Sequence, residues 1–134
     1  MRRMIGVGLC LALTSLPLAV TAEPISGTVW TGIIPDAFPD IEYQWTILAD
    51  GTYEENGWRK STGGAVQPTL TGIWSYEADL LFMMQDTDGF SFAGEIHGDF
   101  MSGNFFEDGS DAGIFCAFKG EVAPVTCQPA EAVS

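Results

Sequence analysis

The chain contains 134 residues, of which 18 are acidic and five are lysine or arginine, giving a formal net charge of −13 at neutral pH. A field of this sign repels phosphate backbones and anionic lipid surfaces, so nucleic acid is not expected as a partner. Nine Phe, four Trp and three Tyr are more aromatic residues than a disordered chain carries, so a packed core is expected.

The first 22 residues have the features of a secretory signal peptide. Two arginines precede an apolar run over residues 5–20, and the small residues of Val20-Thr21-Ala22 suit a signal peptidase. The run is shorter than the roughly 20 residues of a membrane-spanning helix, and Pro17 interrupts it. We therefore expect cleavage before Glu23, export to the periplasm or the medium, and no membrane insertion afterwards. The three remaining basic residues would give the mature chain a net charge of −15.

Runs of β-forming residues alternate with turn residues along the mature chain. Asp-Gly pairs at 50–51, 88–89 and 108–109 suit tight hairpins, because glycine accepts the positive φ that such turns need. Turn signals recurring at intervals of about 8–12 residues are typical of an all-β sandwich or barrel. The predicted strands are 27–34, 41–49, 51–60, 69–77, 80–86, 89–97, 100–107 and 111–121. The expected organisation is a signal peptide over 1–22, a β-barrel domain over 23–122 and a C-terminal tail over 123–134.

Apolar residues recur at every second position in several of these strands, which indicates antiparallel strands with one buried face. Trp30, Trp45 and Trp74 fall on such faces and are predicted to point inward and to be largely buried. Residues 89–107 are predicted to form a hairpin that turns at Gly98-Asp99 in a type II′ turn. Counting outward from that turn places Ile96 opposite Met101 and Phe92 opposite Phe105.

The segment Leu80–Met84 is apolar on both faces. A strand covered by the core on one side and by something else on the other would explain this pattern. The segment is therefore the candidate surface for a protein partner.

Two cysteines remain after signal cleavage, Cys116 and Cys127. In an exported protein we expect them to form a disulfide that holds part of the C-terminal tail to the last strand.

Eight short strands joined mostly by tight turns predict an all-β fold, an eight-stranded antiparallel up-and-down barrel, with a β-sandwich as the alternative. The run from Gly27 to the turn Asp50-Gly51-Thr52-Tyr53, then Gly72-Ile73-Trp74 and the glycine-punctuated segment 92–103, resembles the calycin superfamily of lipocalin-like and avidin-like barrels. The resemblance implies this fold, and it implies that such a barrel often holds a small ligand.

No pattern in the sequence predicts catalytic residues, a metal site or a cofactor. His97 is the sole histidine, and although it shares a strand face with Glu95 and lies near Asp99, this is read as a solvated face. The aspartate-rich segments 86–89 and 108–111 are read as hairpin turns rather than calcium loops. Glu54 and Glu55 are adjacent on a strand, so they point to opposite faces and cannot act as a facing pair.

A set of aromatic residues forms the candidate ligand site. In an eight-stranded barrel these rings either stack an apolar or planar ligand or fill the interior themselves. The first hypothesis is thus an exported binding protein for a small apolar ligand, and the second is a protein-interaction module, such as an inhibitor or envelope component, with a filled core. A small enzyme ranks third, and an internal cavity of a few hundred cubic ångströms would favour the first. The candidate residues are Trp30, Tyr43, Trp45, Trp74, Phe92 and Phe105.

Overall fold

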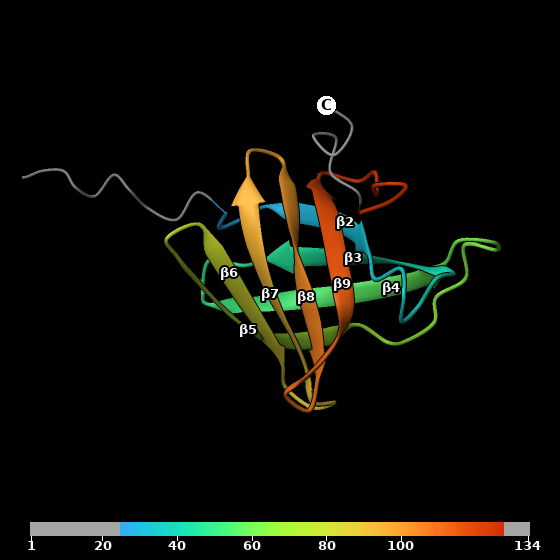
Figure 1. Ribbon diagram of the computed structural model, residues 1–134, viewed down its shortest axis with the longest axis horizontal. Coiled ribbons are helices and arrows are strands. Elements are labelled where there is room, and N and C mark those ends of the chain that lie inside the picture. The colour runs from blue at the N-terminus through green and yellow to red at the C-terminus, as the bar shows by residue number, and fades with distance from the viewer. Residues whose placement is uncertain (1–24, 128–134) are drawn as a thin grey trace, which may run out of the picture.

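Eight antiparallel strands close into one barrel in the computed structural model, which describes residues 25–127 (Figure 1). The predicted signal peptide over 1–22 lies outside the described residues. Among residues 25–127, no helix has the length and apolar character needed to cross a membrane. The strands are β2 (Val29–Ile33), β3 (Ile41–Ile47), β4 (Thr52–Arg59), β5 (Leu70–Glu77), β6 (Leu80–Gln85), β7 (Phe90–His97), β8 (Phe100–Glu107) and β9 (Ser110–Lys119).

Each strand pairs with its neighbours in sequence, and β2 pairs with β9 to close the barrel. This confirms the predicted up-and-down barrel, the architecture that the calycin resemblance implied, over the sandwich alternative. In Figure 1, β7, β8 and β9 stand upright while β3 and β4 cross the view, as expected for strands that coil around a small barrel.

Glycines occupy several of the turns where the backbone enters the left-handed region, whereas the β5–β6 turn does so at Ala78 and Asp79. Gly51 and Gly89 have φ values of 90° and 74°, and the Asp108-Gly109 turn has both residues at positive φ. Gly98 has a φ of 65°, the sign that the first position of a type II′ turn requires. The hairpin over β7 and β8 therefore has the predicted register, in which Ile96 faces Met101 and Phe92 faces Phe105.

Aromatic rings pack against one another inside the barrel. Trp45 has no exposed surface, and its ring centroid lies 5.3 Å from that of Phe92 and 5.8 Å from that of Phe115. Phe38, in the loop between β2 and β3, packs edge-on against Tyr43 and Phe105 and so covers this end of the core. The rings fill much of the volume that an eight-stranded barrel offers to side chains.

Two of the three tryptophans predicted to be buried are fully buried, namely Trp30 and Trp45. Trp74 differs, because it is half-buried and packs at the margin of the core. Its indole Nε1 donates a hydrogen bond to the backbone oxygen of Leu48 at 2.8 Å. Trp74 faces inward as predicted but is less buried than Trp30 and Trp45, since β5 pairs with β4 only up to Ile73 and leaves the indole beyond the last pair.

The disulfide between Cys116 and Cys127 is present, with Cα atoms 5.5 Å apart. Cys116 lies on the outer face of β9, where it forms a second, smaller core with Ile33 of β2 and Cys127. Phe100 and Ala123 pack against this cluster. The first part of the predicted tail therefore crosses the outside of the barrel over the β2–β9 pair.

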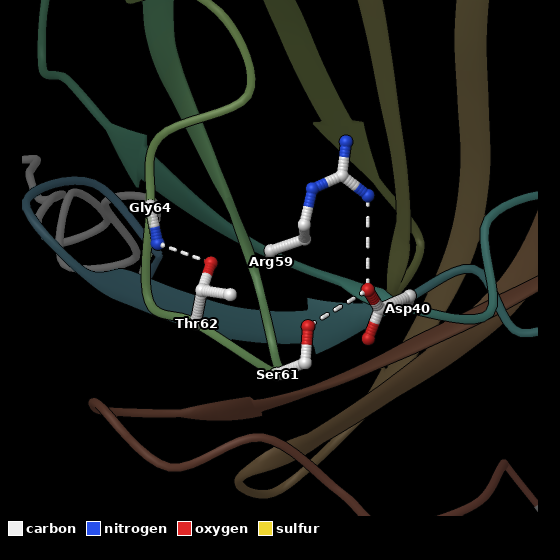
Figure 2. A network of polar contacts seen from close by, with 5 residues as sticks. All are labelled: Asp40, Arg59, Ser61, Thr62 and Gly64. Carbon is white, nitrogen blue, oxygen red and sulfur yellow. Dashed lines mark hydrogen bonds and ion pairs between the residues drawn. The ribbon is translucent and has the colours of Figure 1, made fainter.

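The loop between β4 and β5, residues 60–69, is anchored to the loop before β3. Asp40 accepts a hydrogen bond from Ser61 Oγ at 3.3 Å and forms an ion pair with Arg59 at 3.7 Å, while the backbone nitrogen of Gly64 donates to Thr62 Oγ1 (Figure 2). Farther along, the backbone nitrogen of Val66 donates to the oxygen of Gly57 on β4. These contacts hold the loop against the end of the barrel.

Candidate functional site

The six aromatic residues predicted to bind a ligand lie on the inner faces of their strands, and five of them are buried. Tyr43 stacks on Trp45 with ring centroids 5.8 Å apart, and Phe92 lies 5.3 Å from Phe105. These neighbours already cover the faces of the rings, whereas Trp74 keeps part of its surface exposed. Contact of these residues with a ligand stays a prediction.

A carboxylate, Glu55, is buried among these rings with only 2% of its surface exposed. Tyr53, Glu55 and Gly57 point inward along β4, and Glu54 points outward, as the alternation of a strand requires. The sequence predicted that Glu54 and Glu55 point to opposite faces of their strand, but it did not show which of the two faces the core. Counting across a two-residue Asp50-Gly51 turn would have paired Trp45 with Asn56. The structure instead joins Leu48 to Thr52, one residue earlier, and this register places Glu55 opposite Trp45 on the inner face.

Three side-chain N–H groups converge on Glu55. Trp45 Nε1 and Gln85 Nε2 donate to Glu55 Oε1 at 2.8 and 3.0 Å, and Gln67 Nε2 donates to Oε2 at 3.0 Å. Gln67 comes from the loop over residues 60–69, so this loop is joined to the interior. Burial raises the pKa of Glu55, and the three hydrogen bonds oppose the rise without cancelling it.

The surroundings of Glu55 also affect two tyrosines. Burial raises the pKa of Tyr53 and of Tyr43, and the nearby Glu55 carboxylate adds to both shifts. Tyr53 Oη and Gln85 Oε1 are buried without a hydrogen-bond partner among the described residues. Glu55, Gln85 and Tyr53 thus form a polar cluster inside an aromatic core. The cluster is shielded from solvent and retains atoms that can accept hydrogen bonds.

A hollow of about 370 Å³ lies on the outer face of the barrel, across β5 to β8. The register brings Ile73, Met84, Ser91 and Phe106 into one row across these strands. The next row on the same face contains Ser75, Phe82 and Ala93. We call this feature the outer hollow, lined by Ile73, Ser75, Phe82, Met84, Ser91, Ala93, Phe106 and Gly109, with Trp74, Met83 and Phe92 beneath.

The outer hollow exists because small residues stand between large ones. Ser91 and Ala93 on β7 separate Phe82 and Met84 on β6 from Phe106 on β8. The large side chains therefore form walls, and the short ones leave the floor open. The walls are apolar, which is unusual for the wetted face of an antiparallel sheet.

The Leu80–Met84 segment forms most of β6, and its two faces differ in burial. Leu81 and Met83 are buried in the core, whereas Phe82 and Met84 on the outer face are 49% and 56% exposed. Ile73 on the neighbouring strand is 55% exposed. Nothing in the described part of the chain covers these side chains, so the expected second cover would have to come from another molecule.

The remaining candidates from the sequence lie outside the Glu55 cluster, and some of them border the outer hollow, which Gly109 lines. His97 Nε2 lies 3.3 Å from Glu95 Oε1 on the outer face of β7. Within residues 25–127, no three histidine, cysteine, aspartate or glutamate side chains are grouped so that they could hold a metal ion. The aspartate-rich segments lie in the β6–β7 and β8–β9 turns.

Comparison with known proteins adds little to this description of the site. No family model and no curated protein matches the chain. A solved structure, the fatty-acid-binding protein isolated from Manduca sexta, matches with 11% identity and a TM-score of 0.42, covering 72% of this chain and 99% of that one.

Proposed function

We propose that this chain is an exported binding protein for an apolar or planar small ligand, and that the ligand occupies the outer hollow. The observation that carries the proposal is the hollow itself, whose volume of about 370 Å³ falls in the range of small-molecule sites, about 300–1,000 Å³. Exposed large apolar side chains gathered in one concave patch are a mark of a binding surface.

The packing of the interior supports placing the ligand outside the barrel. Trp45 has no exposed surface and is surrounded by Tyr43, Phe92 and Phe115, so a ligand could enter there only by displacing rings. Trp74 and Phe92, two of the six predicted site residues, adjoin the outer hollow. Their role in the proposed site is to form its floor.

A pair of variants tests the proposal. Ala93→Trp places an indole in the floor of the hollow, and Thr46→Trp places one on the outer face of β3, away from it. The uncharged planar dye N-phenylnaphthylamine should bind the wild type and Thr46→Trp with saturable fluorescence enhancement. Its affinity for Ala93→Trp should fall at least about tenfold, since the site is filled. Equal binding by the two variants, or no saturable binding at all, would refute the proposal.

Export is the second part of the proposal. The disulfide between Cys116 and Cys127 favours an oxidising compartment. The mature protein from its own host should begin at Glu23, which an intact-mass measurement decides. A mass that retains residues 1–22 or carries a lipid would contradict it.

A second candidate function is a protein-interaction module that uses the Leu80–Met84 strand. The exposed Phe82 and Met84 side chains on a barrel with a packed interior favour it. Native mass spectrometry of the protein from its own host separates the two functions: an added mass of a few hundred daltons supports the ligand, and a bound polypeptide supports the module.

A further inference from the structure

Carboxylates stand at both ends of the outer hollow. At one end, Glu77 and Glu95 flank Leu80 in the row next to Ser75, Phe82 and Ala93. Both glutamates are exposed, and Glu95 lies 3.3 Å from His97. A molecule that fills the hollow and extends toward Leu80 therefore ends beside the carboxylates of Glu77 and Glu95.

The opposite end is acidic as well. Asp86 follows β6, two residues beyond Met84, and accepts a hydrogen bond from Thr71 Oγ1 at 2.7 Å on the outer side of β5. The Asp108 carboxylate lies against Gly89, and Gly109 beside it lines the hollow. The hollow therefore has an apolar floor and walls with a negatively charged rim.

The described strands that carry the hollow and its rim, β5 to β8, contribute no lysine or arginine. The sequence from Leu70 to Gly109 contains neither lysine nor arginine. Arg59 is paired with Asp40 at the far end of β4 (Figure 2), and Lys119 is paired with Asp99. The field over the hollow is thus set by carboxylates, and an anion entering it would be repelled.

We infer that the ligand of the outer hollow is a cationic amphiphile, an apolar body that carries an amine or quaternary ammonium group; this inference rests on the proposed function. The apolar body would lie between Ile73, Met84 and Phe106, and the ammonium group would lie at the rim. Carboxylates attract an ammonium directly, and the exposed Phe82 and half-buried Phe106 side chains that line the hollow are aromatic rings whose π faces would attract it further. The same rim disfavours a carboxylate or phosphate amphiphile of equal length.

Three probes with chains of twelve carbons, the carboxyl carbon included, test the charge of the ligand: dodecyltrimethylammonium, dodecyl maltoside and dodecanoate, each below its critical micelle concentration. Binding is followed by calorimetry at low ionic strength, with near-UV circular dichroism to verify that the barrel stays folded. The cation should bind about tenfold or more tightly than the anion, with the uncharged probe between them. The difference should shrink in molar salt, where the Debye length is about 3 Å.

Two double variants with equal net charge show whether the rim is responsible. Glu77→Gln with Glu95→Gln removes charge at the hollow, and Glu42→Gln with Glu121→Gln removes the same charge elsewhere. The first should reduce the preference for the cation severalfold, and the second should leave it nearly unchanged. Equal effects would assign the preference to the overall charge and overturn the inference.

The outcomes also separate the inference from the proposed function. Equal affinity for all three probes, or tightest binding of dodecanoate, would overturn the cationic ligand and leave the binding function in place. Failure of every probe and of the uncharged dye to bind would refute the proposed function itself.

Discussion

Replacing Glu55 with alanine should destabilise the barrel, because it removes the acceptor of three side-chain N–H groups. Two of the donors, Trp45 Nε1 and Gln85 Nε2, are buried. A buried donor left without an acceptor costs about 1–3 kcal/mol, so the two together predict a loss of about 2–6 kcal/mol in the free energy of unfolding. Glu54→Ala is the matched control on the outer face of β4, and it should change this free energy by less than about 0.5 kcal/mol.

Glu55→Gln separates the hydrogen bonds from the charge. Burial raises the pKa of Glu55 above its ordinary value of 4.5, so between pH 4.5 and the raised pKa the folded protein keeps a proton that the unfolded chain has lost. The resulting stabilisation is fully present below the ordinary pKa and is lost as the pH rises through the raised pKa. Glutamine retains an acceptor for Trp45 without titrating. The stability of Glu55→Gln relative to the wild type should therefore increase with pH across this window.

Urea unfolding of the wild type and the three variants, at pH values on both sides of the ordinary glutamate pKa, measures these differences. The alanine variant should be less stable than the glutamine variant at every pH. Equal stability of the two would show that the carboxyl group does not organise the donors around it. A loss in Glu54→Ala as large as that in Glu55→Ala would show that the facing of β4 is inverted.

Three further predictions concern stability. Replacing Cys116 and Cys127 with serine should lower the free energy of unfolding by about 2–4 kcal/mol, and an unchanged urea midpoint would contradict this. Trp45→Ala should cost about 3–5 kcal/mol and Trp74→Ala clearly less, because only the former is fully buried; the reverse order in urea unfolding would refute the burial argument. Gly103→Ala should cost about 1–3 kcal/mol or more, since its Cβ would collide with the Ala93 backbone oxygen, whereas Gly64→Ala in an open loop should be nearly neutral in the same measurement.

The barrel and much of its register were predictable, because the patterns concerned are local. Period-two alternation identifies a strand face within one segment, and a glycine at positive φ identifies the turn from which pairing is counted. The hairpin around Gly98 combines both signals, and its register was predicted residue by residue. The disulfide was predicted because the expected loss of Cys10 with the signal peptide leaves only Cys116 and Cys127.

The candidate sites were less predictable, because each depends on residues from several strands. Ile73 and Phe106 each look like isolated apolar residues on a wetted face of their own strand, and only the pairing of β5 to β8 brings them together with Met84. Glu55 lies in a strand whose residues 54–56 are all polar, so alternation alone could not orient it. Gln67 comes from a loop, where no periodicity applies.

The segment after β9, which the disulfide holds over the β2–β9 pair, affects the order in which the strands of the barrel separate. The β2–β9 ladder joins the partners that are most distant along the described chain, Trp30 and Lys119 among them, so closing it carries a larger entropic cost than closing the other ladders. We expect this seam to form last and to open first. The segment held by the disulfide covers the outer side of the β2–β9 pair and opposes the separation of these two strands. After reduction, amide hydrogens of β2 and β9 should exchange faster with solvent, while those of the central β7–β8 hairpin keep their protection.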